Sequence, residues 1–324
     1  MTAIDTYASL GPRTSFASLA YPLGIIAVAY GVIPFVANDY VFDAILAPFL
    51  ALSLAAVGLN ILTGYAGQVS LGSAAFMAVG AYAAFNFDLR LDGLPLPLTL
   101  VLAGLTAAVV GVFFGLPSLR LKGFYLAVST LAAQFFVQWA LTKFGWFSNN
   151  NSSGVIDAPS LGFLGFTFNG PQGRYLFSVS VVLLLTFFAW INVLRTKLLA
   201  FAISSFIIGI AGVLWAFAYL KTVEPHGFNL DRSFQILFII IIGGLASIRG
   251  AFFGAALIVV CPLILSRVGG TLFGDLFDSG VLDMSQRIVI GALIVAFLIA
   301  EPDGLVALWD RLKKRLTQRA GSES

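Results

Sequence analysis

The sequence predicts an all-α, polytopic integral membrane protein, in which a single transmembrane domain over residues 1–324 contains about ten helices. Hydrophobic residues make up 59% of the chain and charged residues 10%, whereas a soluble domain carries about 25% charged residues. Apolar runs long enough to cross a bilayer follow one another along most of the chain. Two of these runs, one in each half of the chain, are interrupted by glycines. These observations exclude a soluble globular domain and favour a membrane protein built from two related halves.

The individual spans follow from runs that are uncharged or nearly so and have the length that a bilayer requires. The first run, residues 14–37, is too long for the core of a signal peptide, so we expect it to be retained. The eighth and ninth spans are divided only by Arg249 and Gly250, and they are either two tilted helices or a broken helix pair. The predicted spans lie at about 16–36, 44–62, 68–87, 95–118, 124–142, 175–191, 198–220, 233–248, 250–266 and 286–305.

Residues 60–73 interrupt the uncharged run Ala44–Phe87 with both glycines and polar side chains. Backbone of this kind persists at membrane depth only where it is buried in protein or lines a water-filled cavity. We therefore predict that the segment lines a translocation pathway, although small residues also form helix-packing faces. The candidate pathway residues are Asn60, Thr63, Gly64, Gly67, Gln68, Ser70, Gly72 and Ser73.

A second set of polar residues lies in and near the fifth predicted span. Gln134 and Gln138 are four residues apart and share one face of a helix, so we add both to the predicted pathway. Asn86, Ser129 and Thr130 are weaker candidates of the same kind. Hydrogen bonding between helices is the alternative explanation for this second set.

The two glycine-interrupted segments resemble each other. Gly67–Phe76 opens one glycine-rich span, and Gly243–Gly254 opens another about 180 residues later. Paired interruptions in two halves are the usual indication of a transporter site at the interface between repeats. The spacing of Gly250 and Gly254 is also typical of close helix packing, which is the preferred interpretation for that pair.

The distribution of Lys and Arg predicts the orientation in the membrane. With ten spans both termini lie on the same side, and that side receives eleven basic residues against seven on the other. We therefore expect tails at about 1–15 and 306–324 to be cytoplasmic and the loop 143–174 to be external.

Several kinds of chemistry are missing from the sequence. The one histidine, His226, falls in a predicted loop, and neither a metal-ligand cluster nor a pair of carboxylates occurs within a span. No phosphate-binding Gly-x-x-x-x-Gly-Lys-Ser/Thr motif is present. The chain is therefore predicted to be neither an enzyme nor a cofactor-binding protein. We expect lipid around it and no nucleic acid partner, with the energy for transport supplied by another protein.

Several stretches closely resemble the permeases of branched-chain amino acid ABC importers, the LivH/LivM family, and in particular the LivM type. The resemblance covers residues 44–310 in order. Its motifs are Gly64-Tyr-Ala-Gly-Gln-Val-Ser-Leu-Gly-Ser-Ala-Ala-Phe76, Pro117-Ser-Leu-Arg-Leu-Lys-Gly-Phe-Tyr-Leu-Ala-Val-Ser-Thr-Leu131, the stretch from Thr196 to Gly212, Ile242-Gly-Gly-Leu-Ala-Ser-Ile-Arg-Gly250 and Ala300-Glu-Pro-Asp-Gly-Leu305.

The resemblance implies a heteromeric importer of the bacterial inner membrane that works by alternating access. It implies a second, LivH-like permease, two LivG/LivF-like ATPase subunits that use ATP, and a periplasmic solute-binding protein. The implied solutes are branched-chain or related small amino acids. Alternatives are a permease of the same family for urea, an amide or an aromatic or carboxylic solute, and an autonomous channel or secondary carrier.

The chain departs from the family in three places. Ala246 stands where the family has glycine, and Ser148–Gly154 replaces a Thr-Gly-Gly element, which leaves the solute open. The family's long cytoplasmic loop between the sixth and seventh spans is represented only by its end, and we expect further residues to be missing between Trp190 and Ile191. ATPase coupling is predicted at Trp190, Ile191, Asn192, Arg195 and Lys197.

Overall fold

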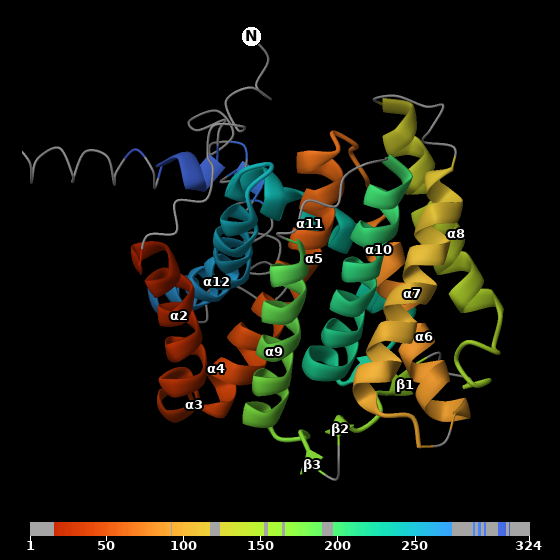
Figure 1. Cartoon of the computed structure of the whole chain (residues 1–324), viewed down its shortest axis with the longest axis horizontal. Helices are drawn as coiled ribbons and strands as arrows, with labels where there is room; N and C mark the ends of the chain where they lie inside the picture. Colours follow the sequence, from red (N-terminus) through yellow and green to blue (C-terminus); the bar gives the residue numbers. More distant parts are fainter. Residues whose placement is uncertain are drawn as a thin grey trace, which may run out of the picture.

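The structure is a computed structural model that describes residues 16–91, 93–116, 124–151, 155–163, 166–189 and 197–273, with a few further positions between 288 and 311. It is a bundle of helices with four very short strands at one end (Figure 1), which confirms the all-α class. Within the described residues, five helical stretches are long and apolar enough to cross a membrane. They are Asp39–Tyr65, Leu96–Gly115, Pro171–Ala189, Lys197–Leu220 and Ile248–Arg267.

The first two predicted spans differ from their expected limits. Residues 16–36 form two helices, α2 (Phe16–Gly31) and α3 (Ile33–Val36), because Pro34 in the first turn of α3 cannot donate a backbone hydrogen bond. The second span begins at Asp39 instead of residue 44 and runs without a break to Tyr65. Its consecutive elements are α4 (Asp39–Val41), the π-helix η1 (Phe42–Leu46), α5 (Ala47–Asn60) and the π-helix η2 (Ile61–Tyr65).

The next five predicted spans are helices, with shifted ends. α6 begins at Ser73, five residues later than the expected 68, because residues 66–72 are not helical. α9 begins at Pro171, so the last residues of the expected loop 143–174 form the first turn of a helix. These elements are α6 (Ser73–Arg90), α7 (Leu96–Gly115), α8 (Phe124–Lys143), α9 (Pro171–Ala189), α10 (Lys197–Val213) and the π-helix η4 (Leu214–Leu220).

The eighth and ninth spans are two separate helices, α11 (Leu230–Gly243) and α12 (Ile248–Phe273). The sequence placed the boundary at Arg249, whereas the structure places it at residues 244–247. Gly244 and Ala246 have positive φ values of 118° and 57°, and this left-handed backbone cannot continue a right-handed helix. The predicted span 286–305 lies largely outside the described residues.

α10 and η4 form the centre of the bundle, where they pack against α5, α6 and α7. Glycines bring these helices into backbone contact. A Cβ atom at Gly80 would lie 2.1 Å from the Gly209 carbonyl oxygen, and one at Gly212 would lie 2.0 Å from that of Met77. Small residues at such interfaces allow close approach in membrane proteins, and this packing holds the interrupted helix α5–α6 beside the core.

One end of the bundle, which we call the strand end, is formed by residues 143–151, 155–163, 166–170 and 221–229. There β1 (Ile156–Asp157) pairs antiparallel with β4 (Thr222–Val223), and β2 (Gly162–Phe163) pairs with β3 (Phe166–Thr167) (Figure 1). Asp43 accepts from Arg174 at 3.0 Å and from Lys221 at 2.9 Å. Three segments far apart in the sequence are therefore joined at this end.

Candidate translocation site

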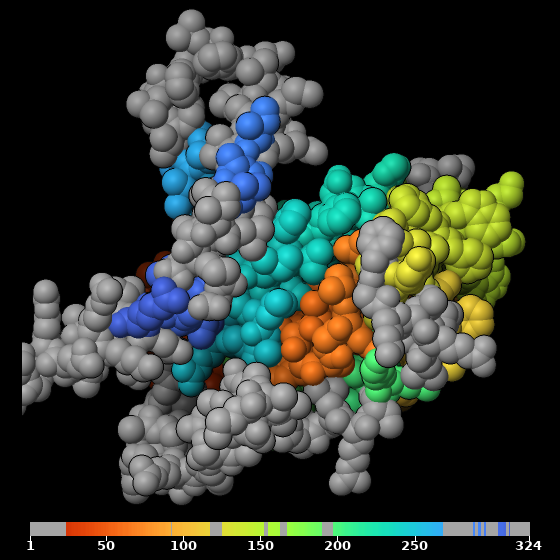
Figure 2. Space-filling model, turned by 90° about the horizontal axis from the view of Figure 1, so that it is seen from above, coloured from red at the N-terminus to blue at the C-terminus, as the bar shows by residue number. Residues whose placement is uncertain are grey.

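The helical interruption after η2 alternates between buried and exposed residues. Gln68 and Ser70 are 4% and 1% exposed, whereas Tyr65 and Val69 are exposed. Viewed from the end opposite the strands, orange surface from this part of the chain lies between the teal surface of the later helices and the yellow surface of α8 (Figure 2). Gln68 and Ser70 are therefore buried within the bundle, and their place on a pathway stays a prediction.

Asn60 joins the two glycine-interrupted segments. Its Nδ2 donates to the Ser247 carbonyl oxygen at 2.9 Å, and its Oδ1 accepts from the Ala246 backbone N–H at 2.9 Å. Asn60 is 1% exposed, so its amide satisfies two polar backbone groups of the α11–α12 turn that would otherwise be unpaired. The segment at 60–73 and the segment at 243–254 thus meet in space through Asn60.

Gly64 lies against the same turn. A Cβ atom at Gly64 would lie 2.2 Å from Asn60 Oδ1 and 2.4 Å from the Ala246 nitrogen. No side chain fits between η2 and the turn, which gives a packing reason for glycine at this position. Gly64 itself therefore contributes backbone contact to the site, with no space left beside it.

Hydrogen bonds close the interruption into a compact loop. Thr63 Oγ1 donates to the Gln68 carbonyl oxygen at 3.2 Å, and the Gln68 backbone N–H donates to the Leu62 carbonyl oxygen at 3.0 Å. Gly67 makes the reversal with a φ of 65°, which glycine adopts without strain. The loop leaves two buried polar atoms without a described partner, Gln68 Oε1 and Ser73 Oγ.

The end of the interruption rests on α8. The Leu71 backbone N–H donates to Thr130 Oγ1 at 2.9 Å, and a Cβ atom at Gly72 would lie 2.6 Å from the Thr130 carbonyl oxygen. The Gly72 backbone N–H donates to Ser70 Oγ at 3.4 Å. Thr130, a second-rank candidate, therefore positions the start of α6.

Gln134 forms part of a network between helices. Its Nε2 donates to the Phe228 carbonyl oxygen at 2.8 Å, and its Oε1 accepts from Ser233 Oγ at 3.1 Å. Ser233 Oγ also accepts from the Ala74 backbone N–H at 2.9 Å, in the first turn of α6. The network joins α6, α8 and α11, which matches the hydrogen-bonding alternative considered for the second set of residues.

The remaining second-rank residues do not join this network. Gln138 and Ser129 are partly exposed on α8, and Asn86 donates to the carbonyl oxygens of Tyr82 at 2.7 Å and Phe147 at 3.0 Å. Sequence reasoning missed Ser233 and Ser247 as partners of the site. Ser247 lies within the glycine motif at 243–254, which was the available signal for it.

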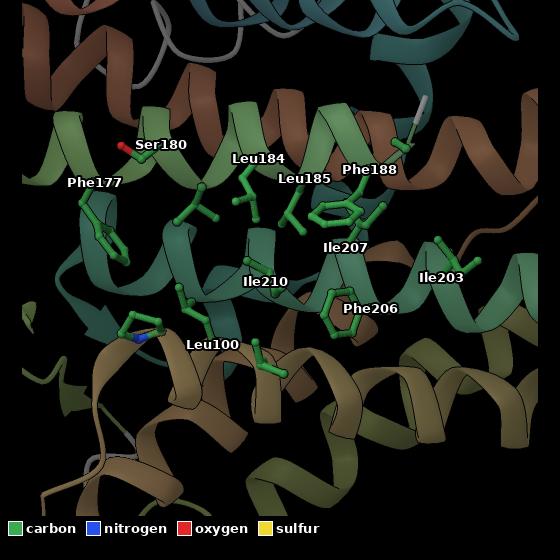
Figure 3. Close-up of a pocket in the computed structure, with 14 residues that line it drawn as sticks. Leu100, Phe177, Ser180, Leu184, Leu185, Phe188, Ile203, Phe206, Ile207 and Ile210 are labelled. Atoms are coloured by element: carbon green, nitrogen blue, oxygen red, sulfur yellow. The ribbon is translucent and has the colours of Figure 1, made fainter. Parts of the chain in front are cut away.

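A large cavity lies elsewhere in the bundle. It has a volume of about 640 Å³ and lies between α7, α9 and α10, where Leu100, Phe177 and Phe206 point into it (Figure 3). Ser180, its single polar side chain, is hydrogen-bonded to Tyr30 at 2.6 Å. None of the predicted pathway residues lines this cavity, which is apolar apart from Ser180.

Only one of the five predicted coupling residues, Lys197, belongs to the part of the chain that the structure describes. Trp190, Ile191, Asn192 and Arg195 lie outside the described residues, and so does the junction at which a missing segment was expected. Lys197 is described as the first residue of α10. Coupling at this segment stays a prediction.

The chemistry available to the site is neutral hydrogen bonding. The predicted pathway residues include no titratable side chain. Within the residues that the structure describes, no group of three or more His, Cys, Asp or Glu side chains is placed to hold a metal ion. Amide and hydroxyl groups of this kind suit a neutral or zwitterionic solute.

Comparisons with known proteins agree on one family. The family described as branched-chain amino acid transport system / permease component matches residues 41–198 and 189–298. The chain is 30% identical over 318 residues to the high-affinity branched-chain amino acid transport system permease protein LivM of Salmonella typhimurium, covering 83% of this chain and 71% of that protein. It is 30% identical over 301 residues to the protein of the same name from Escherichia coli, covering 78% and 67%. No solved structure matches the chain.

Proposed function

Because this chain belongs to the family of branched-chain amino acid transport permeases and is a permease subunit of an ABC importer, we propose that it moves branched-chain or related small amino acids across the membrane. The observation that carries the proposal is the similarity to LivM along most of the chain. The neutral, buried polar groups at the helical interruption support it, because a zwitterion needs hydrogen bonds and no net compensating charge.

The transport step is alternating access at the interruption between η2 and α6. Gln68, with its unpartnered Oε1, and Ser70 are the groups that would contact the solute. Asn60, Thr63, Thr130 and Gln134 hold the surrounding backbone through the bonds described above. Switching such a permease from about 1:99 to 99:1 in favour of one state requires a preference of about 5.5 kcal/mol, which ATP binding by partner subunits would supply.

The partners follow from the same membership. We infer a LivH-like second permease, two LivG/LivF-like ATPases that bind the ATP, and a periplasmic binding protein that delivers the solute. The chain itself carries no cofactor and no catalytic activity in this proposal. Its place is the bacterial inner membrane, with both termini cytoplasmic and the strand end facing the periplasm.

Coupling to the ATPases is proposed at Trp190–Lys197, since this segment resembles the end of the family's coupling loop. A cysteine at Asn192 should cross-link to an ATPase subunit, whereas one at Asn150 on the strand end should not. Peptide mapping of the purified protein tests whether further residues lie between Trp190 and Ile191. A peptide in which Trp190 is joined directly to Ile191 would refute that prediction.

The decisive experiment is uptake into proteoliposomes that contain the complete transporter and its cognate binding protein. Labelled leucine, isoleucine and valine should accumulate in the presence of ATP, and a transporter with hydrolysis-deficient ATPase subunits is the matched control. Uptake of urea or of an aromatic acid in place of these amino acids would overturn the solute assignment. Uptake by this chain without any ATPase subunit would overturn the importer.

A further inference from the structure

A second polar cluster lies between η4 and the first turn of α11, next to Ser233, which contacts the first turn of α6. Arg232, in the first turn of α11, places its guanidinium carbon 4.0 Å from the centre of the Trp215 ring. Trp215 belongs to the π-helix η4 and contacts Tyr219, with ring centres 4.6 Å apart and the ring planes tilted by 50°. π-Helical turns occur frequently at functional sites.

Two buried N–H donors of this cluster lack a hydrogen-bond partner among the described residues. They are Arg232 Nε and Trp215 Nε1, each with almost no exposed surface. Nε is bonded to the carbon that sits over the indole, so the two donors lie a few ångströms apart. Few buried polar groups in folded proteins stay unpaired, and a close pair of donors calls for an acceptor.

The protein supplies no described carboxylate for this guanidinium. The two described ion pairs, Arg174–Asp43 and Lys221–Asp43, do not include Arg232. Its Nη1 donates to Gln235 Oε1, a neutral acceptor, and the neighbouring Asp231 carboxylate accepts from Asn229 Nδ2 at 3.4 Å. The Asp231 carboxylate interacts with the guanidinium electrostatically, but among the described residues no carboxylate pairs with it at contact distance. An ionisable side chain inside a helical bundle is a mark of a substrate path.

Gly227 lies beside the indole and has no side chain to cover the donor. A Cβ atom at Gly227 would lie 2.8 Å from Leu220 Cδ1, 3.8 Å from Glu224 Cγ and 3.9 Å from Trp215 Nε1. The carbonyl oxygen of Phe228, the residue after Gly227, accepts from Gln134 Nε2, and Ser233 Oγ donates to Gln134 Oε1. The first turn of α11, which carries Arg232, is thereby fixed to α8.

We propose that Arg232 Nε and Trp215 Nε1 bind the carboxylate of the transported amino acid as it enters from the strand end. This inference rests on the proposed function, since it names the group of the solute that is recognised. Arg and an indole N–H are suited to the task, because charge-assisted hydrogen bonds to a carboxylate are short and strong. The helical interruption would then receive the solute from this position.

The first test is leucine uptake by the complete transporter with its binding protein. Arg232→Ala and Trp215→Phe should lower the uptake rate by about tenfold or more, the effect of losing a hydrogen bond to a charged group, and Arg232→Lys should retain part of it. Arg90→Ala is the matched control. The Arg90 guanidinium carbon also lies 4.0 Å from the centre of an indole ring, that of Trp146, but Arg90 is not part of this cluster. Equal rates in Arg232→Ala and Arg90→Ala would overturn the proposal.

The second test separates the site from the solute assignment. Tryptophan fluorescence of the purified complete transporter, without binding protein, should change on titration with L-leucine and with sodium acetate, but not with L-leucinamide. Trp215→Phe should abolish the change. If the wild-type transporter takes up no amino acid, the proposed function is refuted. The fluorescence titration of the same protein with acetate then tests the carboxylate site independently of that function. A response to inorganic phosphate only would assign the donors to lipid headgroups and overturn the proposal.

Discussion

Ala246 occupies a backbone conformation that suits glycine, with a φ of 57°. It stands where related permeases are expected to have glycine, and its N–H is held by Asn60. The left-handed conformation costs an alanine about 1–2 kcal/mol. The contacts of Asn60 and the absence of space at Gly64 keep the turn in this shape despite the cost.

Ala246→Gly should therefore stabilise the protein. The relief of strain exceeds the added unfolded-state entropy of glycine, about 0.5–1 kcal/mol, so we expect the melting temperature in detergent to rise by about 1–3 °C. Ala251→Gly, at a buried helical position of α12, is the control and should lower it. A lower melting temperature for Ala246→Gly would show that the turn is not strained.

Gln68→Leu should impair transport without blocking assembly. The side chain is buried, and its Oε1 has no described partner, so leucine removes a group available to the solute and leaves the Thr63 contact to the Gln68 backbone intact. We expect uptake to fall by about tenfold with normal amounts of complex in the membrane. Val69→Leu, on the exposed side of the same loop, should transport normally, and equal uptake in both variants would remove Gln68 from the pathway.

At the scale of elements, the sequence predicted which segments are helical better than where they end. Hydrophobic runs located the spans because the bilayer sets their length. The ends depended on single residues: the turn at Gly244 and Ala246 separates α11 from α12, while Arg249, the charge used as a boundary, lies inside α12. The π-helices η1, η2 and η4 have no hydrophobic period of their own and were not predicted.

The candidate site could be predicted only in part. Glycines among polar residues located the interruption at 60–73, and the repeat identified the segment at 243–254. The pairing of Asn60 with Ala246 and Ser247 joins residues 186 and 187 positions apart, and a single sequence contains no measure of such a contact. The Arg232–Trp215 cluster was missed because Arg232 was assigned to a loop.

Because the backbones of α6 and α10 are in contact at Gly80, we expect Gly80→Ala to destabilise the protein. The added methyl carbon would lie 2.1 Å from the Gly209 carbonyl oxygen, and two helix backbones would have to separate, at a cost of about 2–3 kcal/mol. We expect lower yield and a lower melting temperature. Gly24→Ala in α2 is the control, since nothing lies within 4 Å of its added Cβ; equal losses in both variants would contradict this packing.

For the whole molecule, the arrangement of the two ends bears on topology. The segments 143–170 and 221–229 meet at the strand end through β1–β4, and Asp43 adds a third segment there. In the predicted topology five spans precede residue 143 and three follow residue 229. These odd numbers place the strand end on the side opposite the termini, in agreement with the eleven-to-seven bias in basic residues.

Cysteine labelling of intact cells tests the orientation. In a Cys261→Ser background, an impermeant reagent should label a cysteine at the exposed Asn150 and should not label one at Gln318 in the basic tail. Both positions should react after the membrane is permeabilised. Labelling of the tail cysteine alone in intact cells would reverse the topology.

The glycine contacts along α6 and α10 also determine which parts of a moving transporter can slide. Sliding between helices needs a layer of side chains that can exchange rotamers, and at Gly80–Gly209 and Met77–Gly212 this layer is absent. α6 and α10 should therefore move together as one rigid body, and the loop at 66–72 should move with them. The distance between spin labels on the outer surfaces of α6 and α10 should be the same with and without ATP, while their distances to a label on α9 should change. A change in the distance between α6 and α10 would show that they are not one rigid body.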